Sequence, residues 1–134
     1  MTIFKISDKY PGFNRSDGVQ FDNTITVPSG INDKIIFNAT ETIAAGGTTT
    51  ALDLTKTLHH IDADAGGDIF TLAAGTTGQV MIVTMESATG VATVTPVAMA
   101  GGTSVTMNAA GESVIFVYQD SQWYIAGGNA YTVV

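Results

Sequence analysis

Apolar and polar residues alternate in short runs over the second half of the chain. From residue 57 onward, runs rich in β-branched and aromatic residues are separated by turns that contain glycine, which is typical of all-β sandwiches and barrels. We predict eight strands there: Thr57–Ile61, Ile69–Ala73, Val80–Glu86, Ala92–Val97, Ser104–Met107, Ser113–Gln119, Gln122–Ala126 and Tyr131–Val134. No stretch has the length and period of an ordinary helix. The expected fold is therefore all-β, a single compact β-sandwich or barrel-like domain of short antiparallel strands.

Residues 113–126, SVIFVYQDSQWYIA, form a predicted hairpin that is apolar on both faces. Alternate side chains of a strand point to opposite faces, and a surface hairpin usually keeps one of them polar. One face should pack into the core of its own domain. We expect the other to pack against the opposing sheet or against the same hairpin of a neighbouring subunit. The predicted subunit interface consists of four aromatic residues: Phe116, Tyr118, Trp123 and Tyr124.

The first 56 residues are less regular. Residues 1–30 combine turn-forming residues with irregularly spaced aromatic residues, which predicts an extended N-terminal arm for docking, followed by a β-rich domain of residues 31–134. Within that domain we expect a short strand at Ile35–Phe37, a helical turn from Glu41 and a strand over Thr48–Leu54. The expected docking residues of the arm are Phe4, Tyr10, Phe13, Arg15 and Phe21.

The tripeptide Ala-Gly-Gly occurs four times, at residues 45–47, 65–67, 100–102 and 126–128. The unequal spacing argues against a solenoid repeat. We expect each copy to end a strand with a turn that needs a positive φ.

The chain is poor in charge and acidic. Only 13% of its residues are charged, about half the roughly 25% of soluble domains, and the net charge is -7. Such a surface suits a subunit that is largely buried against partners, and it makes nucleic-acid binding improbable on electrostatic grounds. All five basic residues lie within the first 56 positions, so the remainder is either a solvated acidic region or the neighbour on which the N-terminal segment docks. There is no cysteine and no apolar run long enough for a membrane span.

One segment has a spacing compatible with metal binding. In a strand, His60, Asp62 and Asp64 would lie on one face, and imidazole and carboxylate groups are ligands of divalent cations. Alternate residues of a flat strand are about 7 Å apart, however, so three such ligands diverge. We therefore favour a polar strand end over a metal site and assign no metal ligand.

The sequence contains no convincing catalytic centre. The two histidines are adjacent, no Gly-x-Ser-x-Gly turn is present and no phosphate-binding loop follows the glycine pairs. We expect no enzyme activity and no cofactor, with a hydrolase of surface polysaccharide as a remote alternative.

Residues 71–128 resemble a β-rich module of tailed-bacteriophage structural proteins, found in head decoration, head-fibre and tail-fibre-tip proteins. The resemblance rests on a Thr-Leu strand followed by a turn ending in Gln, a Val-Thr-Pro strand, a Gly-Gly-Thr turn, a Gly-Glu-Ser-Val segment, and a Trp-Tyr strand before a glycine pair. These features lie at Gly75–Gln79, Val94–Pro96, Gly101–Thr103, Gly111–Val114 and Trp123–Tyr124.

This resemblance implies a non-enzymatic virion protein that is a homotrimer. The short chain favours a capsid decoration (cement) protein on the outer capsid surface, which would bind the major capsid protein and bridge capsid subunits. The alternative is a short tail-fibre, head-fibre or spike module that binds a host receptor or glycan. No catalytic residues are implied.

Overall fold

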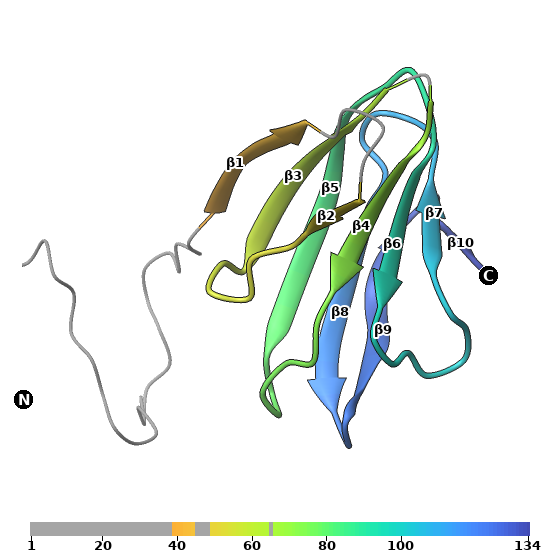
Figure 1. The fold of residues 1–134 in the computed structure, drawn as a ribbon. Helices are drawn as coiled ribbons and strands as arrows, with labels where there is room; N and C mark the ends of the chain where they lie inside the picture. Colours follow the sequence, from red (N-terminus) through yellow and green to blue (C-terminus); the bar gives the residue numbers. More distant parts are fainter. Residues whose placement is uncertain (1–38, 45–48, 65) are drawn as a thin grey trace, which may run out of the picture. The chain divides into compact units, whose positions relative to one another are not determined.

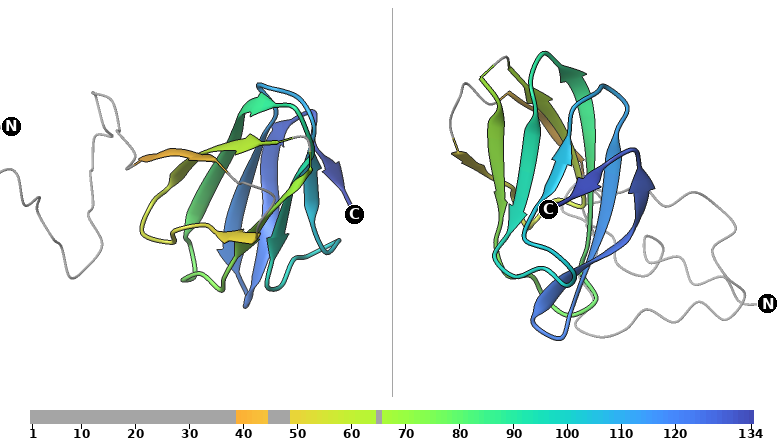
Figure 2. Two further views of the ribbon diagram at one scale, coloured as in Figure 1. Left: turned by 45° about the horizontal axis from the view of Figure 1, so that its top comes forward. Right: turned by 90° about the vertical axis from the view of Figure 1, so that its right-hand side faces the viewer.

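The described part of the protein is an all-β sandwich of two five-stranded sheets (Figures 1 and 2). The structure, a computed structural model, describes residues 39–44, 49–64 and 66–134. The strands are β1 (Ala39–Ala44), β2 (Thr49–Ala51), β3 (Leu58–Ala63), β4 (Asp68–Leu72), β5 (Val80–Ala88), β6 (Ala92–Pro96), β7 (Val105–Met107), β8 (Ser113–Gln119), β9 (Gln122–Asn129) and β10 (Thr132–Val133). Sheet A has the order β1-β3-β5-β8-β9, and sheet B has the order β10-β7-β6-β4-β2.

The first six strands alternate between the two sheets, and their neighbours within each sheet are parallel. In sheet A, β3 pairs with β1 and β5, and in sheet B, β4 pairs with β2 and β6. The chain therefore winds through three coils of a small two-sheet solenoid. The last four strands close it with antiparallel pairs: β8 with β5, β9 with β8, β7 with β6 and β10 with β7.

The sandwich is confirmed, but the expectation of antiparallel strands holds for only half of the pairings among the described strands. The argument against a solenoid was also wrong. The coils differ in length: Thr49 pairs with Ile69, and Leu58 pairs with Ile82, so one coil takes 20 residues and the other 24. A period that changes from coil to coil leaves no fixed repeat in the sequence.

All eight strands expected after residue 57 are present, with boundaries shifted by one to three residues. The helical turn expected from Glu41 is wrong, because that segment is part of strand β1 and pairs with β3. Its β-branched residues favour the extended backbone that this pairing needs. The expected strand at Ile35–Phe37 lies outside the described residues.

The Ala-Gly-Gly segments serve two purposes. Gly67 and Gly101 have φ of 77° and 81° and lie in turns, as expected. The last copy instead lies inside β9, where the register between β8 and β9 shifts at Ile115/Phe116 and leaves Ala126 as the extra residue of a β-bulge. The turn between these strands is formed by Asp120 and Ser121, whose φ of 49° and 63° are typical of a type I′ hairpin.

Every second side chain of the central strands points into the space between the sheets. In β3, β6 and β8 the burial alternates strictly, as the period of two requires. The largest fully buried side chains are Trp123, Phe70, Phe116, Ile61, Leu72, Met81, Met85 and Met107. The two sheets are thus held together by one apolar core.

We expect Phe70→Ala to lower the free energy of unfolding by about 3–5 kcal/mol, the range for removing a large buried side chain. Phe70 has no exposed surface, whereas its neighbour Ile69 points outward and is 46% exposed. The matched variant Ile69→Ala should cost under about 1 kcal/mol. Urea unfolding of both variants tests this, and equal losses would contradict the assignment of the two faces of β4.

Candidate interaction surfaces

The inner face of the β8–β9 hairpin belongs to the core. Phe116 and Trp123 have no exposed surface and Tyr118 is 8% exposed. The Tyr118 and Phe116 rings meet the indole of Trp123 edge to face, with ring centroids at 5.0 Å and 6.3 Å. These three residues are therefore not a subunit interface, because side chains that fill their own core are inaccessible to a second chain. Of the four expected interface residues, Tyr124 remains, with 40% of its surface exposed.

The outer face of sheet A carries two adjacent rows of apolar side chains. Cross-strand register defines the rows: the first holds Val80, Val117 and Tyr124, and the second holds Leu58, Ile82, Ile115 and Gly127. Their side chains are partly or fully exposed, and neither row contains an ionisable group. We call these residues the apolar rows. The second apolar face predicted for the hairpin is therefore real, and it extends onto β5 and β3.

Uncharged polar residues border the apolar rows on both sides. Next to the second row, register places His60 beside Thr84 and Ser113. The Nδ1 atom of His60 lies 2.9 Å from the hydroxyl of Thr84. Beyond the first row, Gln119 pairs with Gln122 at the end of the hairpin. An apolar centre with a polar border is the usual anatomy of a protein interface.

The residues considered for metal binding are not brought together. His60 and Asp62 share the outer face of β3, but Asp64 lies beyond the end of that strand, where its carboxylate accepts a 2.8 Å hydrogen bond from the Gly66 amide. Within the described part of the chain, no group of three or more potential metal ligands is found.

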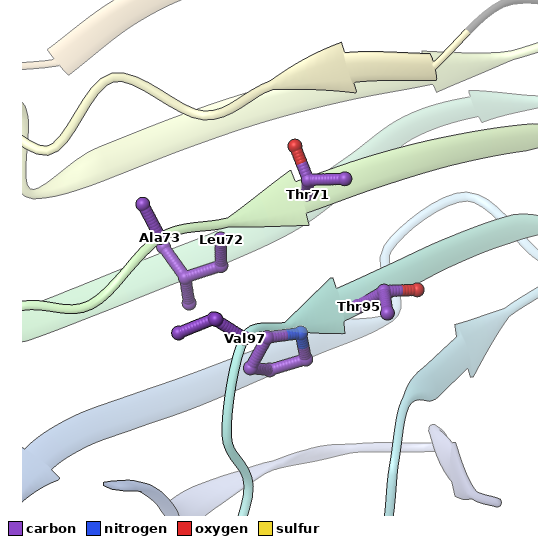
Figure 3. A pocket seen from close by; sticks show the side chains of 6 residues that line it. Thr71, Leu72, Ala73, Thr95 and Val97 are labelled. Atoms are coloured by element: carbon purple, nitrogen blue, oxygen red, sulfur yellow. The ribbon is translucent and has the colours of Figure 1, made fainter. Parts of the chain in front are cut away.

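The outer face of sheet B is uncharged and rich in threonine. Its outward-facing strand positions are Thr49, Ala51, Ile69, Thr71, Thr93, Thr95, Thr106 and Thr132. Where β4 and β6 end, an open groove of about 420 Å³ is lined by Thr71, Leu72, Ala73, Thr95, Pro96 and Val97 (Figure 3). None of these lining residues is aromatic or ionisable, so the groove offers no stacking platform and no acid–base group.

The residues that carry the phage resemblance meet around Trp123. The indole Nε1 donates a 2.8 Å hydrogen bond to the Ala73 carbonyl, and the ring covers Gly75, where an added Cβ would lie 2.8 Å from Cζ2. The Gln79 side chain accepts a hydrogen bond from the Thr76 amide and donates one to the Leu54 carbonyl, at 2.9 Å and 2.7 Å. This Trp123 clamp ties the β4–β5 loop to β9 and to the β2–β3 turn. The motif residues therefore maintain the fold.

Two acids that sequence alone left unassigned also stabilise loops. Asp68 is 2% exposed and its carboxylate accepts a 2.8 Å hydrogen bond from the Asp64 amide. Glu112 is 7% exposed and accepts hydrogen bonds from the Asn108 and Ala109 amides. Both carboxylates are held by backbone donors and fix turns next to their strands.

His59 is a residue whose importance the sequence did not reveal. It points into the core, has no exposed surface, and neither ring nitrogen has a hydrogen-bond partner. Burial lowers the pKa of His59, although the nearby Lys56 and Asp53 carbonyl groups and the Asp53 carboxylate oppose this shift. The strict alternation of β3 puts His59 and His60 on opposite faces. That alternation was the signal available in the sequence.

The expected docking residues of the arm (Phe4, Tyr10, Phe13, Arg15 and Phe21) lie outside the described residues, as does the boundary at residues 30/31. No helix in the described segments is long and apolar enough to cross a membrane. Neither a protein-family model nor a curated protein matches the chain.

We expect Gly75→Ala to lower the free energy of unfolding by about 1–3 kcal/mol, because the new methyl group must displace the rigid indole ring. The emission of Trp123, the single tryptophan, should also change. Gly127→Ala is the control, since its Cβ would lie 3.9 Å from Ile115 Cδ1, an ordinary contact. Chemical unfolding followed by fluorescence gives both readouts. Equal destabilisation by the two substitutions would argue against the Trp123 clamp.

Protonation of His59 should weaken the fold. Since the pKa of His59 is lowered in the folded state, the unfolded chain takes up the proton first. The stability contribution is then complete above the ordinary histidine pKa of about 6.5 and decreases as the pH falls below it. In His59→Leu this part of the pH dependence should disappear, whereas His60→Gln should retain it. Thermal unfolding between pH 8 and pH 5 measures the effect, and identical pH profiles for wild type and His59→Leu would refute it.

Proposed function

We propose that the protein is a structural subunit of a tailed-bacteriophage virion: a capsid decoration (cement) protein that binds the outside of the assembled shell and bridges capsid subunits. The resemblance of residues 71–128 to virion β-modules supports this proposal. The motif positions behind that resemblance include Gly75, Gln79 and Trp123, which build the Trp123 clamp. The resemblance thus concerns residues that the fold requires.

The outer face of sheet B is the observation that carries this role. Its outward-facing strand positions hold threonine, alanine and isoleucine and no ionisable group. Burying such a face against the shell desolvates no charge, which is the main penalty when polar surfaces associate. Ile69 and Val97, 46% and 68% exposed, supply apolar contact area at this face.

The arm of residues 1–30 is the second part of the proposed attachment, with its aromatic residues as anchors on the shell. A chain lacking residues 2–20 should keep the folded sandwich but lose binding to assembled shells. Cosedimentation with shells of the phage that encodes the chain measures binding, and Trp123 emission verifies the fold. Saturation of shells by the truncated chain would contradict the role of the arm.

A charge introduced on the sheet B face separates the two parts of the attachment. Val97→Lys should weaken shell binding while leaving the arm unaltered, and Asp120→Lys, at the exposed hairpin turn, is the matched control. Equal binding by both variants would exclude the sheet B face. Retention of the full chain on host cells or glycans without any shell, together with no binding to shells, would favour a receptor-binding fibre or spike module.

A further inference from the structure

The apolar rows on sheet A are shaped for a copy of themselves. On β9, Tyr124 of the first row stands out from the sheet with 40% of its surface exposed. Gly127, on the same strand and in the second row, has no side chain, and a Cβ placed there would meet Ile115 alone, at 3.9 Å. One strand therefore carries a knob and a hollow on the same face.

We propose that a second copy of this chain packs face to face on the apolar rows, with Tyr124 of each copy in the hollow over Gly127 of the other. A two-fold axis between the rows, perpendicular to the strands, produces this exchange. It places β9 over β9, β8 over β8 and β5 over β5, and lays the first row of one copy on the second row of the other. Residue pairs are then reciprocal, as a two-fold contact requires: Val117 meets Ile115, and Val80 meets Ile82.

Charge and size both favour a second copy as the occupant. Two chains that each carry a net charge of -7 repel one another, so contact is favoured where neither presents an ionisable group, as in the apolar rows. The same axis lays the glutamine end of one copy over the Thr84–Ser113 border of the other, so the flanking rows place no acid against an acid.

The available area agrees with a stable contact. With strands about 4.8 Å apart and about 3.3 Å per residue, four strands of the length of β5 present a face of roughly 600 Å². This is close to the roughly 800 Å² per partner of a standard interface. An exposed tyrosine near its centre matches the residue type that dominates binding energy at such contacts.

The test uses the full chain in dilute solution without any shell, so its result is independent of the shell-binding assay. Sedimentation equilibrium should give twice the chain mass at micromolar concentration. Tyr124→Ala, which removes the knob, and Gly127→Leu, which fills the hollow, should each weaken association about tenfold or more. The β9 backbone accepts a side chain at residue 127, because its φ lies outside the positive region. Val97→Ser, on the other sheet, is the control and should have no effect.

The double variant Tyr124→Ala/Gly127→Leu provides the most specific readout. Each copy then carries a leucine where the other has lost the tyrosine ring, so association should be partly restored relative to either single variant. Trp123, buried on the opposite face of the hairpin, reports that each variant is folded. A monomer at all concentrations, or a three-copy mass unaffected by both single variants, would overturn the two-fold contact.

Discussion

The alternation of side chains across each strand is the constraint on which this structure depends. Two sheets enclose one core, so each strand can place only one of its faces against the opposing sheet. In β8 and β9 the inner positions are filled by Phe116, Tyr118 and Trp123, and their burial obliges the intervening residues to point outward. The outward residues are apolar on sheet A and mainly threonine on sheet B. The core thus determines both the stability of the domain and the character of its two surfaces.

The sequence allowed the strands to be located, because their periodicity is local. It could also be seen that the hairpin has two apolar faces. The core face was not identifiable from the hairpin itself, because Phe116 and Tyr124 are both aromatic and differ only in what lies opposite them. Strand direction was equally hidden, since parallel coils of 20 and 24 residues leave no constant period. Such features depend on contacts between distant segments.

The candidate site shows the same division. The resemblance singled out Gly75, Gln79 and Trp123, but the reason they occur together became visible only when the Trp123 clamp joined the β4–β5 loop to β9. His59 was grouped with His60 as part of a possible metal segment. In the fold, one is an uncompensated core residue and the other borders the apolar rows.

The mixed pairing of the sheets has a consequence for how the chain is made. The parallel coils β1–β6 are synthesised before β8 and β9, yet β8 pairs with β5 and Trp123 of β9 seals the loop that follows β4. While the ribosome still carries the C-terminal strands, the edge of β5 has no partner strand among them and the core is open. The sandwich can therefore close only after about the last twenty residues have emerged, so folding must follow translation rather than accompany it. The rapid, local β8–β9 hairpin, with its two-residue turn, is well suited to complete that late step.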